Sequence, residues 1–509
     1  MSSPGRPFGT WKVPLLVEAM KYLIESIDYF LRQLPPGRME FTLGRQQPGA
    51  EGKPKPNWRP EGVAVCRVKV KTGDGRTVAG CSGDRPSYGW LDKRSDRDAT
   101  TKMRSLVGMM NAVRDLWLEQ PAFDSLFPHW LGRHKEICRI GAERGEEELT
   151  AAFCSAFIER ALIDALCRAI GEPVFSGIRS PDIGFQPGMV HPELKGLELA
   201  ALLPARPGTR FFVRHTVGLS DPITGGDIAE RLDDGEPEAL DEYVKRDGLR
   251  YFKVKISGDP AADCTRLARI WAVLPKTPGT VVTLDGNEAY EDLGEFSGFV
   301  DRLQSELPGL FQHIPFIEQP LTRRLTFDPA SKPWIAKIRE HKPLVIDEAD
   351  GQLDSFRRAR ELGYAGTSHK NCKGFFKSLM NRALCGVFQQ RDGGDALLTG
   401  EDLSLMPLVS LNQDYAALGL LGIRDCERNG HHYSFGLSHL TAAEKESALR
   451  DYPDLYVRRG DEVFLNIVNG AVSCASVQGT PGFGVRELPD WSAMKPLATW
   501  LDEHYPAGG

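Results

Sequence analysis

Tyr251-Phe-Lys-Val-Lys-Ile-Ser-Gly258 is the stretch from which the fold of this chain can be worked out. Its aromatic and β-branched residues, followed by a Gly-Asp-Pro turn, predict a β-strand. Because successive side chains on a strand point to opposite faces, Lys253 and Lys255 share one face, about 7 Å apart. Two neighbouring ammonium groups disfavour each other's protonation, so a lysine of this pair is a candidate base with a lowered pKa. The alternative is an ordinary solvent-facing pair.

Four more short segments along the chain end in an ionisable residue, as this strand does. Counted from Lys255, these residues follow at steps of 30, 33, 29 and 23. One strand–helix unit of a (β/α)8 barrel takes about 30 residues, and barrel active sites lie at the C-terminal ends of the strands. The segments therefore predict consecutive barrel strands that end at Asp285, Glu318, Asp347 and Lys370.

The order of these residues predicts how they are arranged around a site. If the lysine pair lies on strand two, Lys370 ends strand six, on the opposite side of an eight-stranded barrel. Three carboxylates then fill the arc between the lysines, and carboxylate oxygens suit a hard divalent cation such as Mg²⁺. Glu348 is an alternative to Asp347 as the third ligand, because only one of two neighbours on a strand faces inward.

This ordered set resembles the enolase superfamily, and within it the muconate-lactonizing-enzyme-like branch of the mandelate racemase/muconate lactonizing enzyme family. That branch has K-x-K on strand two, Asp, Glu and Asp on strands three to five, and a lysine on strand six. Asp285-Gly-Asn287 is similar to the family's D-x-N, and Lys370-Asn-Cys-Lys-Gly374 is loosely similar to its turn after strand six. The resemblance covers roughly residue 39 to the C-terminus and is weakest between residues 85 and 150.

The resemblance implies roles for these residues. Lys255 is the expected acid or base, and Lys370 is its partner on the opposite face or an electrostatic stabiliser of an enolate. Lys253 tunes Lys255 and contacts the substrate carboxylate. Mg²⁺ is the expected cofactor, with Asp285, Glu318 and Asp347 as its ligands. Asn287 and Glu401 are candidate substrate contacts. A structural role is the alternative for Asn287.

The implied architecture is a modified (β/α)8 TIM barrel with an α+β capping domain. We expect an N-terminal helical extension over residues 1–38, because apolar residues recur at helical spacing between residues 11 and 34. The cap is expected over residues 39–210, the barrel over 211–440, and a segment returning to the cap over 441–509.

Within the predicted cap, residues 62–71 and 77–81 alternate like two strands around a Thr-Gly-Asp-Gly turn. The resemblance implies that the loop after this hairpin, residues 82–94, closes over the substrate, with Tyr88 and Trp90 as contacts. An ordinary surface loop is the alternative. Residues 147–170 predict a long amphipathic helix.

The remaining barrel strands are predicted at residues 211–217, 396–402 and 431–436. His215 on the first is a candidate site residue or a structural histidine. Glu401 and Asp402 end the seventh strand, where a related branch would carry a catalytic histidine. His431 and His432 open the eighth, and at most one of them can face inward.

Composition places the chain among ordinary globular enzymes. It has 509 residues, of which 41% are apolar and 26% charged, with a net charge of −6, which disfavours nucleic-acid binding. Ten cysteines without metal spacing indicate reduced thiols and a cytoplasmic protein, and no segment predicts a signal peptide or membrane span. The expected partners are a small-molecule carboxylate and further copies of the chain in a homo-oligomer.

These observations predict an isomerase or lyase that removes a proton α to a carboxylate and stabilises the resulting enolate with Mg²⁺. Racemisation or epimerisation, cycloisomerisation and elimination share the same constellation, so the residues do not choose among them. A metal-dependent aldolase or hydrolase barrel and a ligand-binding barrel without catalysis are the alternatives.

Overall fold

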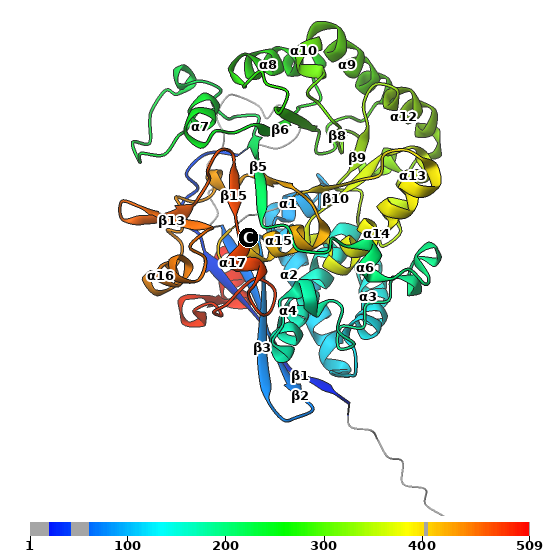
Figure 1. The fold of residues 1–509 in the computed structure, drawn as a ribbon, viewed down its shortest axis with the longest axis vertical. Coiled ribbons are helices and arrows are strands. Elements are labelled where there is room, and N and C mark those ends of the chain that lie inside the picture. Colours follow the sequence, from blue (N-terminus) through cyan, green and yellow to red (C-terminus); the bar gives the residue numbers. More distant parts are fainter. Residues whose placement is uncertain (1–19, 42–60, 402–405, 508–509) are drawn as a thin grey trace, which may run out of the picture.

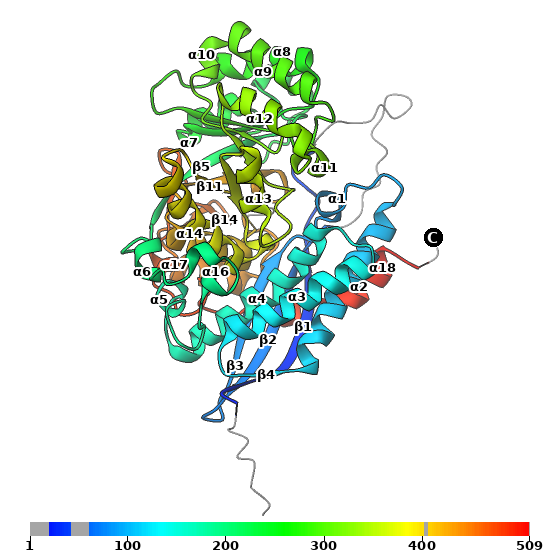
Figure 2. The same cartoon turned by 90° about the vertical axis from the view of Figure 1, so that its right-hand side faces the viewer.

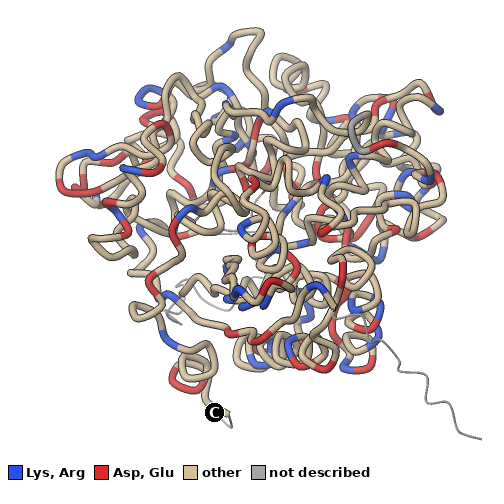
Figure 3. The backbone as a smooth tube through the Cα atoms, turned by 60° about the horizontal axis from the view of Figure 1, so that its bottom comes forward, with Lys and Arg blue, Asp and Glu red and all other residues tan. Residues whose placement is uncertain are grey.

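The computed structural model describes residues 20–41, 61–401 and 406–507. The chain forms two parts, which Figure 2 shows one above the other: a curled parallel sheet surrounded by helices, and a smaller antiparallel sheet covered by long helices. None of the helices in the described ranges is both long and apolar enough to span a membrane. Basic and acidic residues are both scattered along the backbone (Figure 3).

The antiparallel sheet has the strand order β16-β1-β2-β3, with the two-residue strand β4 (Ala122–Phe123) also paired to β1. Strands β2 (Gly62–Thr72) and β3 (Thr77–Asp84) form the predicted hairpin. The short C-terminal strand β16 (Lys495–Pro496) pairs with β1, and α18 (Leu497–His504) follows it. The C-terminus of the chain therefore adds to the same sheet as its N-terminus.

Strand β1 (Tyr22–Gln33) corrects the predicted N-terminal helix. It pairs with β2 along its whole length, so the helical prediction is wrong for these residues; residues 1–19 lie outside the described ranges. A β-bulge between Ile24 and Ser26 shifts the register by one residue, and this hides the strand's alternation.

Three long helices cover this sheet: α2 (Ala99–Glu119), α3 (Leu126–Glu143) and α4 (Glu148–Ile170). Helix α4 is the one predicted from the sequence, and its residues are buried from Leu149 to Cys167. It ends where Gly171 adopts a left-handed conformation with φ of 74°, which glycine reaches without steric cost. Between α4 and β5 lie only short helical turns, α5 (Val174–Gly177) and α6 (Leu199–Leu202) among them.

Eight parallel strands form the curled sheet in the order β11-β10-β9-β8-β7-β6-β5-β12, and β15 (Ala471–Ser473) adds to β5 in the antiparallel direction. Their bounds are β5 (Arg210–Val217), β6 (Tyr251–Lys255), β7 (Val281–Asp285), β8 (Ile317–Glu318), β9 (Leu344–Ile346), β10 (Gly366–His369), β11 (Leu397–Gly400) and β12 (Asp425–Arg428).

Helices connect these strands, as Figure 1 shows. In chain order the longer ones are α7 (Leu240–Asp247), α8 (Pro260–Val273), α9 (Leu293–Glu306), α12 (Lys332–Arg339), α13 (Ser355–Leu362), α14 (Phe375–Asp392), α15 (Val409–Leu421) and, after β12, α16 (Ala442–Asp451); α10 (Pro308–Phe311) and α11 (Arg323–Thr326) are single turns. Helix α8 shows how sharply β6 is terminated: Gly258 has φ of 85°, Asp259 accepts from the backbone of Ala261 and Ala262, and Pro260 opens the helix.

The edge strands β11 and β12 lie against each other, which curls the sheet. A Cβ atom built on Gly400 would come within 2.5 Å of the backbone oxygen of Asp425, so glycine permits the close approach. The predicted eighth strand at residues 431–436 is wrong. Strand β12 lies earlier, and residues 430–432 form a 3₁₀ turn after it.

Candidate active site

The ionisable residues predicted from the sequence lie at one end of the curled sheet. Lys255 on β6 is paired in register with Asp285 on β7, and Asp285 with Glu318 on β8. Asp347 directly follows β9, and Lys370 directly follows β10. All of these side chains are at most 4% exposed, so the site is a buried cluster of opposite charges.

Lys253 lies at the centre of this cluster. Its Nζ atom is 2.9 Å from Asp285 Oδ2 and 2.9 Å from Glu318 Oε2. It also donates to Glu401 Oε2 at 2.6 Å and to Glu427 Oε2 at 3.1 Å. Four carboxylates from four different strand ends therefore share one ammonium group.

Glu427 on β12 joins the three lysines, and sequence reasoning missed it. Besides Lys253, it lies 3.6 Å from Lys255 Nζ and 3.9 Å from Lys370 Nζ. Thr216 on the neighbouring strand β5 donates to its Oε1 atom at 3.1 Å. The sequence does contain a signal for this strand, because Asp-Cys-Glu-Arg at residues 425–428 follows Gly400 by about one strand–helix unit. The prediction instead places the eighth strand in the segment that begins with His431 and His432.

Lys253 does not have the lowered pKa that two adjacent ammonium groups suggest. Burial alone lowers the pKa of Lys253, but Asp285, Glu318, Glu401 and Glu427 together raise it well above its ordinary value. For Lys370, burial is likewise outweighed, mainly by Asp347, and its pKa is raised. The prediction is therefore wrong for Lys253, because neighbouring carboxylates outweigh the like charge.

The carboxylates respond to the same charges in different ways. Burial raises the pKa of Glu427, but the three lysines reverse this effect and hold it far below its ordinary value. Burial and the nearby Glu401 raise the pKa of Glu318, and the Lys253 ammonium only partly offsets them. Glu427 is therefore ionised. A further cation beside Glu318 would stabilise the charged form of that carboxylate, which burial disfavours.

Asp347 and Glu348 face different partners. Lys370 lies 3.2 Å from Asp347 Oδ2, and Lys373 donates to Asp347 Oδ1 at 3.0 Å. Glu348 Oε1 instead accepts from Asn287 at 2.9 Å and from the indole of Trp90 at 3.1 Å. Asp347 therefore belongs with the lysines, and Glu348 connects the sheet to the cap.

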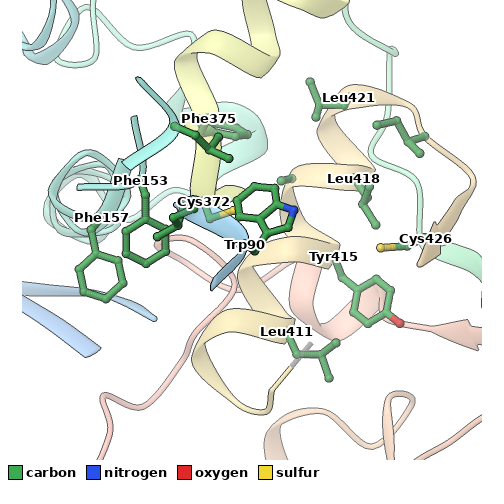
Figure 4. Packing of buried hydrophobic residues seen from close by; sticks show 14 of the residues in the cluster. Trp90, Phe153, Phe157, Cys372, Phe375, Leu411, Tyr415, Leu418, Leu421 and Cys426 are labelled. Atoms are coloured by element: carbon green, nitrogen blue, oxygen red, sulfur yellow. The ribbon is translucent and has the colours of Figure 1, made fainter. Parts of the chain in front are cut away.

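The predicted closing loop meets the site through Trp90. Trp90 lies in the short helix α1 (Tyr88–Leu91), and Lys370 Nζ is 5.1 Å from the centre of its ring. Arg323 fixes the loop by donating to the backbone oxygens of Trp90 and Leu91. Trp90 is also one of the buried residues of the large apolar cluster, part of which is drawn in Figure 4. Tyr88 packs edge-on against Tyr505 of the C-terminal segment.

Glu401 and Asn287 both lie within the cluster as supporting groups. Glu401 forms a buried ion pair with Arg214 in addition to its bond to Lys253. The backbone amide of Asn287 donates to Asp285 Oδ1 at 2.9 Å, and Lys93 donates to the backbone oxygen of Asn287. These contacts hold the carboxylates of Glu401 and Asp285 in place. Asp402 lies outside the described residues.

His215 does not reach the cluster. Arg214 and Thr216, its neighbours on β5, contact Glu401 and Glu427, and so His215 points to the opposite face of the sheet. There it stacks against His431 and Tyr243, which agrees with the structural alternative.

Asp285, Glu318 and Asp347 offer oxygen atoms that fit a hard divalent cation. Among the described residues, neither Glu318 oxygen nor Asp347 Oδ2 accepts a hydrogen bond. The Lys253 ammonium acts as a stand-in cation, since it is shared by Asp285 and Glu318. The donor set therefore suits Mg²⁺, which favours carboxylate oxygens over nitrogen or sulfur ligands.

Comparison with known proteins gives a consistent result for the fold. No family model and no curated protein matches the sequence. Solved structures do match, including an enolase from Bradyrhizobium complexed with magnesium and mandelic acid, at 16% identity and a TM-score of 0.55, covering 93% of this chain and 97% of that one.

Two other solved structures extend the likeness. A muconate lactonizing enzyme from Klebsiella pneumoniae matches at 15% identity and a TM-score of 0.52, covering 95% of this chain and 99% of that one. A dipeptide epimerase from Enterococcus faecalis V583, complexed with Mg and L-Leu-L-Tyr, matches at 15% identity and a TM-score of 0.51, covering 80% and 90%. The chain therefore has the fold of the mandelate racemase/muconate lactonizing enzyme family of the enolase superfamily, as its sequence resemblance predicts.

Proposed function

We propose that this protein is a metal-assisted enzyme that removes a proton α to a carboxylate and stabilises the enolate, with the curled sheet acting as a closed (β/α)8 barrel. The observation that carries the proposal is that Lys255 and Lys370 approach Glu427 from β6 and β10. The three intervening strands carry the carboxylates. Two amines on either side of a ligand, with a cation site along one edge, suit the handling of a carbon-bound proton.

The two lysines have different surroundings, which suggests different roles. Lys255 Nζ is held 2.6 Å from Asp285 Oδ2, on the side of the site opposite Lys370, so Lys255 is the proposed acid or base. Lys370 carries a raised pKa and lies over the Trp90 ring, so it is the proposed permanent cation beside the enolate. Mg²⁺ held by Asp285, Glu318 and Asp347 would supply Lewis-acid stabilisation of the negative charge on the substrate.

The proposal covers racemisation or epimerisation, cycloisomerisation and elimination of a small carboxylate. The solved structures with this fold include an epimerase and a muconate lactonizing enzyme, which supports this range of reactions. A hydrolase barrel, or a barrel that only binds ligands, would not exchange an α-proton, whereas an aldolase would also break or form a carbon–carbon bond, which the same NMR spectra would reveal.

The test is ¹H NMR in D₂O with a library of carboxylic acids. We expect α-proton exchange with at least one acid, its loss in EDTA and its return with Mg²⁺. Asp285→Asn, Glu318→Gln and Asp347→Asn should each weaken Mg²⁺ binding measured by calorimetry, because each removes an anionic ligand. Glu348→Gln is the matched control, since Glu348 is held by Trp90 and Asn287. Exchange that survives EDTA, or unchanged Mg²⁺ affinity in all three variants, would contradict the proposal.

Trp90→Ala should lower kcat/KM by about tenfold, because a cation–π contact with a buried ammonium is worth about 1–2 kcal/mol. The Mg²⁺ affinity should not change. Trp90→Phe keeps an aromatic face but not the indole N–H, so it separates the Lys370 contact from the Glu348 hydrogen bond. Tyr88→Ala is the control, because Tyr88 packs on Tyr505, and equal kinetic losses in Tyr88→Ala and Trp90→Ala would contradict the assignment.

A further inference from the structure

A second group of metal-ligand side chains lies outside the lysine–carboxylate cluster. Asp221 follows β5, and His431 and His432 form the 3₁₀ turn after β12. One potential ligand atom from each of the three residues lies within 4.8 Å of the other two. All three are buried, with exposed fractions of 7%, 8% and 0%.

The hydrogen bonds of His432 leave a cation position beside Asp221. Its Nδ1 atom faces the backbone oxygen of Asn429 at 2.9 Å, so this nitrogen carries the proton. Its Nε2 atom faces Asp221 Oδ2 at 2.8 Å. A lone pair facing a carboxylate oxygen is repulsive, so a 2.8 Å contact requires a proton between the two atoms; a metal ion bound by both would take the place of this proton, with the nitrogen and oxygen moving slightly apart. A ring nitrogen that donates to a backbone carbonyl while the other ligates is the usual arrangement at metal sites.

His431 and Asp221 contribute ligand atoms that have no other partner. Neither ring nitrogen of His431, nor Asp221 Oδ1, has a hydrogen-bond partner among the described residues. Such buried polar groups cost free energy unless something satisfies them. The rings of His431 and His432 have centroids 3.7 Å apart, so their nitrogens can be presented to one ion.

The sheet separates this group from the candidate active site. On β5, Arg214 and Thr216 point toward the carboxylates, whereas His215 points away and stacks on the His431 ring at 4.4 Å. Asp221 itself is anchored by the backbone amide of Gly218 at 2.8 Å. The histidines therefore lie behind the strand, in a separate environment.

We propose that Asp221, His431 and His432 form a binding site for a borderline divalent cation of the Zn²⁺ type. Two imidazole nitrogens and one carboxylate oxygen suit Zn²⁺, which prefers nitrogen ligands more than Mg²⁺ does, and leave one tetrahedral position for water. The ion would join the loop after β5 to the turn after β12. Because Glu427 lies only four residues before His431, a metal ion that joins these two segments would also position Glu427 among the three lysines.

The test is titration of the full chain, stripped of metal, with Zn²⁺ in isothermal calorimetry. With Mg²⁺ in excess to fill the carboxylate site, we expect one Zn²⁺ site, with affinity reduced by about tenfold or more in Asp221→Asn, His431→Gln and His432→Gln. His191→Gln is the matched control, because His191 is also buried but lies far along the chain, in a separate 3₁₀ turn. Glu318→Gln should leave this affinity intact, which separates the site from the carboxylates.

A spectrum of the wild-type chain with Co²⁺ supplies a second measurement that needs no variant to fold. Visible absorption typical of a four-coordinate nitrogen and oxygen site supports the proposal. The absence of this absorption, Zn²⁺ affinity unchanged in His431→Gln and His432→Gln, or loss of the same Zn²⁺ affinity in Glu318→Gln would each overturn it. The readouts are metal binding and not catalysis, so the proposed reaction can fail without affecting this test.

Discussion

Lys255→Ala is expected to lower α-proton exchange by about 100- to 10,000-fold, the usual contribution of a positioned acid or base. Lys255 is the amine that Asp285 contacts at 2.6 Å, and alanine leaves no group in its place to receive the proton. The measurement is α-proton exchange in D₂O, with circular dichroism to verify that the variant folds.

Arginine variants separate a base from a fixed cation. Arginine stays protonated at every accessible pH, so Lys255→Arg should remain inactive, whereas Lys370→Arg should restore part of the activity that Lys370→Ala loses. In a racemisation, each alanine variant should instead lose exchange from one enantiomer only. Full exchange in Lys255→Arg would remove Lys255 from its role, and with it the mechanism.

Glu427→Gln is expected to reduce the free energy of unfolding by about 3 kcal/mol or more, because it leaves buried lysines with a missing counter-charge. Glu427 lies within 3.9 Å of the ammonium groups of Lys253, Lys255 and Lys370. Exchange activity should also fall, because the two outer lysines lose the carboxylate that they share. Urea unfolding of wild type and variant measures the difference.

The control is Glu361→Gln on the exposed face of α13, where Glu361 pairs with Arg357 at 3.4 Å and a loss of about 0.5 kcal/mol or less is expected. The pKa of Glu427 is held far below its ordinary value, so its stabilising effect is complete above about pH 4.3 and is lost as the pH falls further. The difference in the free energy of unfolding between wild type and Glu427→Gln should therefore become smaller at acidic pH. A loss no larger than that of Glu361→Gln would contradict this assignment.

The strands that carry the predicted site could be derived from the sequence because their signals are local. Each is a short apolar run that ends in a turn, and the recurrence of an ionisable residue about every 30 positions identified them as one series. Strands β6 and β7 have the predicted ends at Lys255 and Asp285. Helix α4 was also predicted from a local pattern, but as an amphipathic helix, whereas the structure buries it on every side from Leu149 to Cys167.

Strand β1 shows where local signals fail. The helical spacing at Leu23, Ile27 and Phe30 is real, but Leu23 is 40% exposed, whereas Tyr22 and Ile24 on either side of it are buried. The bulge after Ile24 shifts the alternation, so the buried residues no longer keep a period of two along the strand. Pairing with β2, about 40 residues away, decides the structure of this segment.

The sequence by itself determined strands β2, β3 and β5 to β11, their order and the residue types at their ends, because these depend on neighbours along the chain; it did not determine β1 or β12. Only the tertiary structure decided that Glu427 joins the lysines, that Trp90 meets Lys370, and that Lys253 has a raised pKa. Each depends on distances between groups far apart in the chain. Charge interactions vary with those distances and with burial. The identity of the residues alone therefore could not give the direction of the pKa shifts.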